Sequence, residues 1–250
     1  MLTTADWDSR YRLQAGWTRD LRRYAYRQVG LHGAGRVLEV GCGTGAVLAD
    51  FTGYAKTGVF GVDINLESLH YARKQLPSAR LAAANALRLP FANAVFDAAL
   101  CHFFLLWVDR PAAALAEMAR VTRPGGAVLA LAEPDYGGRI DYPPPLEPLG
   151  RLQTDSLRRQ GAEPLMGRRL AGLMRGAGLV QVQTGVLQAG WGGAPPKEAR
   201  ASEWQVLRSD LGDSVPAADL AAYERIDREA WQFGERVLYV PTFYAWGRVP

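Results

Sequence analysis

Short apolar runs alternate with segments of helical periodicity through the first half of the chain. Apolar runs bounded by Gly, Pro or polar residues predict strands, which we place at 37–40, 59–63, 80–84, 96–101 and 127–132. Apolar positions at helical spacing predict helices, which we place at 7–30, 46–51, 66–76 and 111–121. Strands that alternate with helices indicate an α/β fold with a parallel sheet covered on both faces.

The second half of the chain has a less regular pattern. Glycines and prolines interrupt the alternation after 136, so we expect irregular structure in the first part of 137–165. We then predict a helix at 168–177, a strand at 179–186, a mostly helical segment at 195–233 divided by Pro216, and a final strand at 236–246.

The composition is that of an ordinary globular protein, with 48% hydrophobic and 22% charged residues. No apolar run reaches the roughly 18–20 residues of a membrane span, and no signal-peptide pattern is expected at the start. Cys42 and Cys101 are the only cysteines, so a disulfide framework is not expected. These features favour a cytoplasmic enzyme. The net charge of +4 includes arginine pairs spread along the chain, which does not favour nucleic-acid binding.

A glycine-rich turn follows the first predicted strand, at Gly41, Gly43 and Gly45. Glycines let the backbone turn tightly and let a ligand approach closely. A helix starting behind the turn would offer free N–H groups to an anionic group. Asp63 ends the second predicted strand, where a carboxylate can bind a ribose diol. Both features indicate a nucleotide or nucleoside site, but they do not separate a nicotinamide enzyme from a methyltransferase.

Further segments in order make the sequence resemble the small-molecule branch of class I S-adenosylmethionine-dependent methyltransferases, the methyltransferase type 11 group that includes quinone-biosynthesis enzymes. They cover about 35–135 and lie at 37–45, 61–63, 85–91, 95–100 and 121–126. The resemblance implies a Rossmann-like fold with a seven-stranded, mostly parallel sheet, helices on both faces and a helical insertion between the last two strands. It also implies that S-adenosyl-L-methionine is the methyl donor and S-adenosyl-L-homocysteine the product.

The resemblance also assigns cofactor-binding residues. The turn and the residues around it would hold the methionine half, the end of the second strand would hold the ribose, and the third strand's end would hold the adenine. Those residues are Glu39, Gly41, Cys42, Gly43, Asp63, Ile64, Asn85, Ala86 and Cys101. Asn85 departs from the family pattern, which has Asp there. The N-terminal helix would fold over the cofactor, with Tyr11, Trp17 and Arg19 as candidates.

The candidate catalytic residues follow the fourth and fifth predicted strands. His102 is the best candidate for a general base because imidazole titrates near neutrality. Tyr136 is a second candidate, and Glu133 and Asp135 face the same edge. A base is needed only if the attacking atom must lose a proton. No metal site is expected.

We divide the chain into an N-terminal cap helix at 1–35, a cofactor-binding core at 36–136 and the remainder of the same domain at 137–250. The segments 137–165 and 190–235 are expected to form an acceptor pocket and lid with the N-terminal helix. Six of the seven tryptophans lie outside residues 30–190, which favours an apolar or aromatic small-molecule acceptor: Trp7, Trp17, Trp191, Trp204, Trp231 and Trp246. The oligomeric state stays open.

Three alternatives remain. A nucleic-acid methyltransferase is disfavoured because Cys101-His102-Phe103-Phe104 lacks the motif of the amino-directed enzymes. A nicotinamide oxidoreductase is disfavoured because no Tyr-x-x-x-Lys pair accompanies the glycines. A protein that binds the cofactor without transferring methyl stays open.

Overall fold

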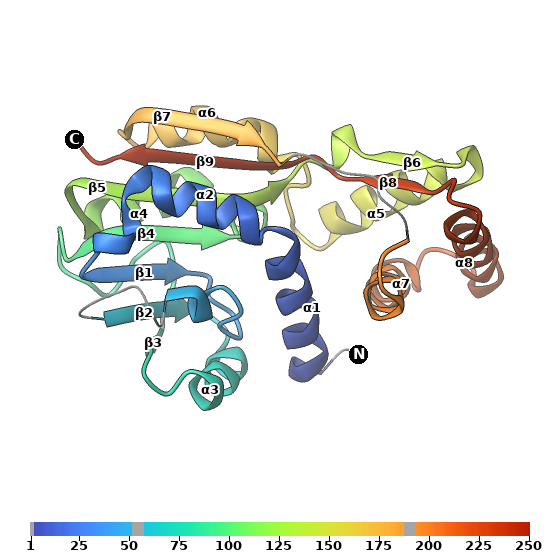
Figure 1. Cartoon of the computed structure of the whole chain (residues 1–250), viewed down its shortest axis with the longest axis horizontal. Helices are drawn as coiled ribbons and strands as arrows, with labels where there is room; N and C mark the ends of the chain where they lie inside the picture. Colours follow the sequence, from blue (N-terminus) through green and yellow to red (C-terminus); the bar gives the residue numbers. More distant parts are fainter. Residues whose placement is uncertain (1–2, 52–57, 188–193) are drawn as a thin grey trace.

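The computed structural model describes residues 3–51, 58–187 and 194–250. Seven strands form one sheet in the order β3-β2-β1-β4-β5-β9-β7 (Figure 1). Their bounds are β1 (Arg36–Val40), β2 (Gly58–Asp63), β3 (Arg80–Ala83), β4 (Phe96–His102), β5 (Thr122–Pro134), β7 (Val180–Val186) and β9 (Thr242–Arg248). β9 is antiparallel to β5 and β7, and the other neighbours are parallel. The predicted Rossmann-like sheet of seven mostly parallel strands is confirmed.

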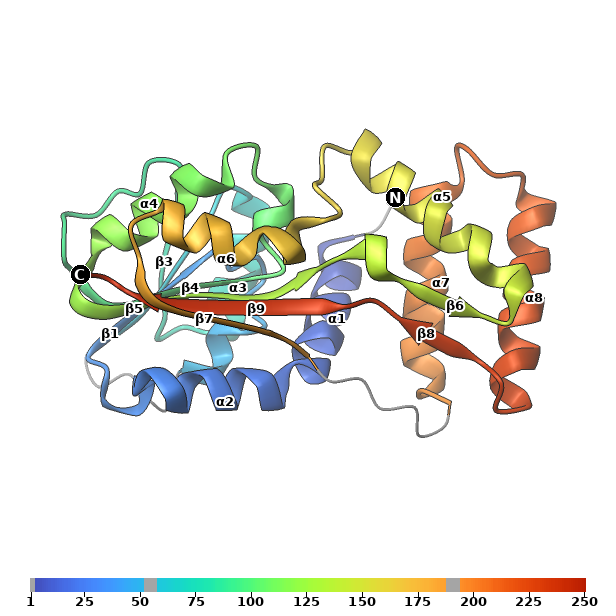
Figure 2. The same ribbon diagram turned by 90° about the horizontal axis from the view of Figure 1, so that it is seen from above.

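Helices cover both faces of this sheet (Figure 2). Successive residues of β4 point to opposite faces, so Ala99 packs in one buried cluster and Leu100 in the other. α4 (Pro111–Val121) and α6 (Met166–Gly176) bury apolar side chains in the first cluster, and α2 (Arg19–Val29) does so in the second. α3 (Leu66–Gln75) packs against β2 and β3. The apolar strands are therefore covered on both sides, as their composition predicts.

A smaller lobe extends beyond the ends of β5 and β9 (Figure 1). It consists of β6 (Ile140–Tyr142), α5 (Glu147–Arg159), α7 (Lys197–Leu211), α8 (Ala217–Gln232) and β8 (Val237–Tyr239), and we call it the accessory lobe. β6 and β8 form an antiparallel pair. The helices enclose a separate apolar cluster that includes Leu149, Trp204 and Leu211. Because α7 and α8 lie between β7 and β9 in the sequence, this part of the chain is a helical insertion between the last two strands of the main sheet.

α1 (Thr4–Trp17) lies between the sheet and the accessory lobe (Figures 1 and 2). It begins with a capping box in which the Thr3 side chain and the Asp6 side chain each bond the other residue's backbone N–H. It ends at Thr18, whose hydroxyl donates back to the Gln14 carbonyl 3.1 Å away. The single helix predicted at 7–30 is therefore wrong, because α1 and α2 meet at Thr18 and point in different directions (Figure 1).

Three other predicted elements differ from the structure. Behind the glycine turn, where a helix was predicted at 46–51, the described residues form only a 3-10 helix at Leu48–Phe51. The final strand is divided into β8 and β9 by Pro241, which has no N–H to donate. The segment 137–165 is more regular than predicted, since β6 and α5 lie within it.

Candidate functional site

The glycine turn at the end of β1 is shaped by left-handed backbone. Gly41, Gly43 and Gly45 have φ of 73°, 49° and 86°, which residues with a Cβ rarely adopt. The N–H groups of Gly41 and Cys42 donate to the Val62 carbonyl at 2.8 and 3.0 Å, so the turn is fixed to the end of β2. The turn therefore presents its backbone at the carboxyl edge of the sheet.

Asp63 lies beside this turn with its carboxylate held in place. Oδ2 accepts a hydrogen bond from the Gly43 N–H and Oδ1 accepts one from the Asn65 N–H, both at 2.8 Å. A carboxylate has about four acceptor positions, so two remain for a ribose diol. Ile64 follows with 76% of its surface exposed, which suits a residue that packs on an adenine ring.

Asn85 and Ala86 lie at the same edge of the sheet, after β3. The Ala84 N–H donates to the Asp63 carbonyl at 2.9 Å, which brings the two predicted binding segments together. The Asn85 Oδ1 already accepts from the Leu87 N–H at 2.9 Å. Its remaining lone pair is the one that an adenine amino group would need, so the departure from Asp costs acceptor capacity.

Glu39 is buried directly behind the glycine turn. Burial raises the pKa of its carboxyl well above the usual range, and the nearby Arg22 opposes that shift. Its Oε2 has no hydrogen-bond partner, and neither does the buried hydroxyl of Thr44. A buried carboxylate oxygen without a partner is costly. A cationic donor, such as the ammonium of an amino acid, is the kind of group that would satisfy it.

The N-terminal helix reaches the turn through Tyr11. Its ring lies 3.4 Å from the position that a Cβ on Gly43 would occupy, and burial raises the pKa of its phenol. Trp17 lies further along α1, under the Arg10 guanidinium at 5.1 Å. Trp17 lines the large cavity described below.

Arg19 points elsewhere. Its side chain is exposed and lines a separate cavity of about 420 Å³ with Arg23 and Arg27, so in this structure it does not lie over the glycine turn. The reason is the break at Thr18, which starts α2 in a new direction. The arginine that lies near Glu39 is Arg22, which donates to the Asp50 carboxylate at 2.7 Å.

The loop after β4 lies over the glycine turn. A Cβ added to Gly41 would come within 2.1 Å of the Phe104 ring, so a ligand on that face requires the ring to turn aside. The Glu133 carboxylate accepts from the N–H groups of Phe104, Leu105 and Leu106 at 2.9, 2.8 and 3.1 Å. Burial raises the Glu133 pKa to about 7, and these three N–H groups oppose the shift. Glu133 therefore positions the loop. Cys101 precedes it and is fully buried, with its backbone at the end of β4.

His102 contacts the junction of α1 and α2. Its Nε2 is hydrogen-bonded to the Thr18 hydroxyl at 2.8 Å, and that hydroxyl also accepts from Arg22 at 2.6 Å. Burial, with a smaller contribution from Arg22, lowers the His102 pKa to about 3. The imidazole is therefore neutral and weakly basic at pH 7. It is not among the residues that line the large cavity.

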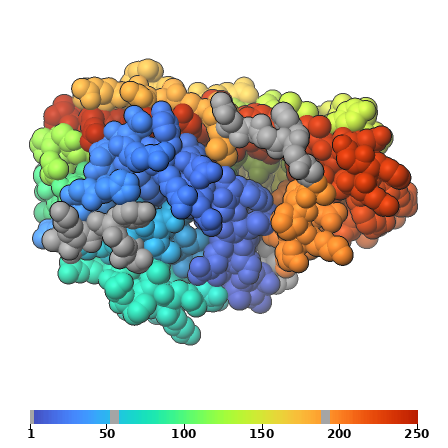
Figure 3. Space-filling model, in the orientation of Figure 1, coloured from blue at the N-terminus to red at the C-terminus, as the bar shows by residue number. Residues whose placement is uncertain are grey.

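A cavity of about 460 Å³ lies between α1 and the accessory lobe, and we call it the acceptor cavity after the role that we propose for it. Figure 3 shows the surface recessed between α1, in blue, and α7, in orange. Two residues line it at the carboxyl edge of the sheet: Phe103, which follows β4, and Pro134, which ends β5. The large aromatic residues in its wall are Trp17, Phe103, Tyr136, Trp204, Trp231 and Tyr239.

Of the two candidate catalytic residues, Tyr136 is the one that lines the acceptor cavity. Burial raises the pKa of its phenol to about 12, with a smaller contribution from Glu203. Its hydroxyl is therefore protonated at pH 7 and can donate a hydrogen bond. The neighbouring Asp135 accepts two hydrogen bonds from Arg168, at 2.5 and 2.7 Å, and has a structural role.

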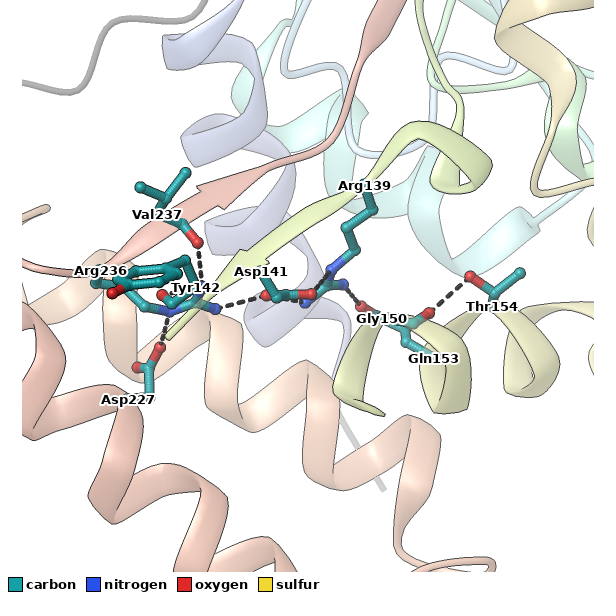
Figure 4. Close-up of polar contacts among 9 residues, drawn as sticks. All are labelled: Arg139, Asp141, Tyr142, Gly150, Gln153, Thr154, Asp227, Arg236 and Val237. Carbon is teal, nitrogen blue, oxygen red and sulfur yellow. Dashed lines mark hydrogen bonds and ion pairs between the residues drawn. The ribbon is translucent and has the colours of Figure 1, made fainter. Parts of the chain in front are cut away.

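A chain of buried ion pairs forms the far wall of the cavity (Figure 4). Arg139 and Arg236 both bond the Asp141 carboxylate, with contacts at 2.6 and 2.7 Å, and Arg236 also bonds Asp227 at 2.6 Å. Asp227 in turn accepts from the Trp204 indole N–H at 2.9 Å. Trp204 is therefore a buried anchor that also lines the cavity. Trp191 lies outside the described residues.

Several of these residues were missed in the sequence: Arg10, Arg22, Phe104, Arg139 and Arg236. The only signal of the four arginines was their residue type, and arginine is so frequent in this chain that type alone selects none of them. Phe104 lies in the run after the fourth strand and has no signal of its own. Among residues 3–51, 58–187 and 194–250, no group of three or more His, Cys, Asp or Glu side chains could hold a metal ion. The helices in the described ranges include none that is long and apolar enough to cross a membrane.

Comparison with known proteins connects this site to a family. Residues 38–130 match the model of a methyltransferase domain. The demethylmenaquinone methyltransferase of Renibacterium salmoninarum is 39% identical over 129 residues, which are 50% of this chain and 53% of that protein. The ubiquinone/menaquinone biosynthesis C-methyltransferase UbiE of Geobacter sp. is 34% identical over 127 residues, 48% of this chain and 54% of that protein. The chain therefore spans about half the length of the curated relatives it matches.

Solved structures share the fold at lower identity. Haemonchus contortus phosphoethanolamine N-methyltransferase 2 has a TM-score of 0.61 at 14% identity, covering 94% of this chain and 54% of that chain. Geranyl diphosphate methyltransferase has a TM-score of 0.56 at 17% identity, covering 95% and 90%. The cyclase SpnF has a TM-score of 0.57 at 18% identity, covering 92% and 80%. These similarities show the fold alone.

Proposed function

We propose that this chain, which belongs to the class I S-adenosylmethionine-dependent methyltransferases, transfers a methyl group from S-adenosylmethionine to an O, N, C or S atom of a small molecule. The observation that carries the proposal is the position of the acceptor cavity. It opens at the ends of β4 and β5, where Phe103 lines it and the adjacent Phe104 lies on the glycine turn. The loop after β4 thus contacts both the cavity and the glycine turn, so a donor at the turn and an acceptor in the cavity would be neighbours.

The residues present fit the cofactor. With the Phe104 ring turned aside, the turn at Gly41 to Gly43 would hold the methionine half, and the partnerless Oε2 of Glu39 would lie near its ammonium group. Asp63 would hold the ribose, and Ile64, Asn85 and Ala86 would contact the adenine. Tyr11 of α1 would cover the turn, and the Cys101 backbone would close the methionine side. Trp17 would lie at the boundary between cofactor and acceptor.

When bound, the cofactor would supply a sulfonium methyl group, which the acceptor atom would attack in line, with S-adenosylhomocysteine as the leaving group. The chain's contribution is to place that atom, which can lower the barrier by several kcal/mol. The aromatic walls of the acceptor cavity would orient an apolar ring and keep water away. The protonated Tyr136 hydroxyl would bind the acceptor as a hydrogen-bond donor. His102, with its low pKa and occupied Nε2, would hold α1 in place rather than remove a proton.

Two further points support a small-molecule acceptor. The cavity volume of about 460 Å³ is in the range of small-molecule sites, roughly 300–1,000 Å³. Relatives in the matched half are named for quinone substrates, which have an aromatic or quinonoid ring. A nucleic-acid acceptor would need a wide basic surface instead of an enclosed cavity.

The test has two steps. Calorimetry should show binding of S-adenosylmethionine and S-adenosylhomocysteine, and no binding of NAD. Incubation with methyl-labelled cofactor and a metabolite mixture should then move label into a small molecule. NAD binding without a response to either sulfur nucleoside would contradict the proposal. Cofactor binding without transfer to any acceptor would support the alternative of a protein that uses the fold without methylation.

A further inference from the structure

We propose that the methyl acceptor carries a carboxylate, which binds between Arg10 of α1 and Arg200 of α7. This inference rests on the proposed function, because it concerns the acceptor side of the same reaction. It identifies a substrate class that the names of the relatives do not suggest, since a quinone ring alone carries no charge.

The charges that line the acceptor cavity do not balance. Four arginines face it: Arg10, Arg139, Arg200 and Arg236. Arg139 and Arg236 are neutralised by the buried carboxylates of Asp141 and Asp227 (Figure 4).

That leaves Arg10 and Arg200 with Glu203 as the one remaining acid among the described lining residues. Counted over the described lining residues and their ion-pair partners, one positive charge is therefore not compensated. A singly charged anion would balance it.

Arg10 has a guanidinium N–H that is not used in any hydrogen bond. Its Nη2 donates to Glu203 at 2.7 Å, and its guanidinium lies 5.1 Å from the centre of the Trp17 ring. The Arg10 residue is only 9% exposed, yet its Nη1 has no hydrogen-bond partner. A buried guanidinium N–H without an acceptor is costly, so this position favours a ligand that accepts.

Arg200 offers a second donor close by. It lies three residues before Glu203, on the same face of α7. Its Nε is buried and also lacks a hydrogen-bond partner. Arg10 bonds Glu203 from α1, and Arg200 lies about one helical turn before Glu203 on α7; each has an N–H without a partner. A carboxylate has two acceptor oxygens and can accept from both, which a neutral carbonyl does less strongly.

The rest of the wall specifies the body of the acceptor. Trp17, Trp204 and Trp231 also line the cavity, so an apolar or aromatic ring suits the remaining space. A carboxylate bound at the arginines would fix one end of such a ring and leave the other end toward Phe103 and the sheet edge. Binding energy from a remote group would then position the reacting atom.

The test uses matched acid and amide probes: benzoate and benzamide, 4-hydroxybenzoate and 4-hydroxybenzamide, 1-naphthoate and 1-naphthamide. Each pair shares one aromatic body and differs in charge. Dissociation constants are measured by tryptophan fluorescence with saturating S-adenosylhomocysteine. We expect at least one acid to bind about tenfold or more tightly than its amide, typical of a charge-assisted hydrogen bond. Arg10→Gln and Arg200→Gln should each reduce that ratio, while Arg151→Gln, an exposed arginine of α5, should leave it unchanged.

Two results would overturn the inference. One is the absence of an acid preference in every pair of the unaltered protein, whether both forms bind equally or neither binds. The other is a preference that persists in both folded variants, as judged by their thermal unfolding. The wild-type comparison stands even if Arg10→Gln fails to fold. Calorimetry with S-adenosylhomocysteine separates the two proposals: an acid preference without cofactor binding would keep the anion site and remove methyl transfer.

Discussion

Replacement of Arg236 by Met tests whether the buried ion pairs of Figure 4 hold the accessory lobe together. The Arg236 side chain is 2% exposed, and Met can fill most of its apolar volume. The substitution removes bonds to Asp141 at 2.7 Å and to Asp227 at 2.6 Å, and one to the Tyr142 carbonyl at 3.2 Å. The effect on stability therefore comes mainly from the two carboxylates that stay behind.

The size of the effect follows from those carboxylates. Asp141 keeps Arg139 as its partner, but Asp227 is left with the Trp204 N–H. Removing one partner of a buried ion pair costs about 3–5 kcal/mol, because the other charge stays desolvated. For a chain of this size about 1 kcal/mol corresponds to roughly 2–4 °C in Tm. We expect Arg236→Met to lower Tm by about 6–20 °C.

A double variant separates charge from packing. Arg236→Met with Asp227→Asn removes the orphaned charge while the Asn Oδ1 can still accept from Trp204, so we expect part of the lost stability to return. The assay is thermal unfolding followed by circular dichroism and by tryptophan fluorescence, with Arg151→Met as the exposed control. A loss below about 1 kcal/mol, or no recovery in the double variant, would refute the reasoning.

Three further predictions concern the core. Asp63→Asn should weaken S-adenosylhomocysteine binding about tenfold or more in calorimetry, because charged hydrogen bonds to the ribose become neutral; an unchanged Kd would show that Asp63 is not the ribose ligand. Glu133→Gln should lower the free energy of unfolding, measured by chemical denaturation, by about 1–3 kcal/mol, because the new side-chain amide N–H groups would face a backbone N–H and leave that donor without an acceptor. Wild-type stability in this variant would contradict the role of Glu133. For His102, whose pKa is about 3 when folded and about 6.5 in an unfolded chain, the unfolded state binds more protons between these values. Stability should therefore fall as pH drops from about 6.5 toward 3, and His102→Gln should flatten that slope; identical slopes would rule the shift out.

The core of the fold was readable in the sequence where local signals and burial agree. α4 was predicted with its observed bounds because Pro111 suits a first helical turn and the apolar spacing continues to Val121. The break at Thr18 was not predicted, because the nearby Gly16 is only a weak break signal inside a pattern that reads as helical on both sides. It depends on tertiary contacts, with the Thr18 hydroxyl bonded between Arg22 and His102.

The two halves of the site differ in the same way. The glycine turn and Asp63 could be predicted because each directly follows a strand, and parallel strands bring their carboxyl ends to one edge. The acceptor cavity depends on pairs far apart in the chain. Arg10 meets Glu203 across 193 positions, and Arg236 meets Asp141 across 95. No local pattern encodes such contacts. Nothing in the sequence around Arg10 and Arg236 distinguishes them from most of the other arginines of the chain.

The division between the glycine turn and the cavity also decides which properties of the relatives apply to this chain. The methyltransferase-domain match covers residues 38–130, and Phe103 is the one described cavity-lining residue within that segment. Every charged residue of the cavity wall lies outside it, on α1 or in the chain after Pro134. Similarity in the matched half therefore concerns the side of the site that would hold the donor, whereas the chemistry of the acceptor depends on residues that the match does not include. For this reason the unpaired donors of Arg10 and Arg200 carry more weight on the identity of the acceptor than the quinone names of relatives that share half of the chain.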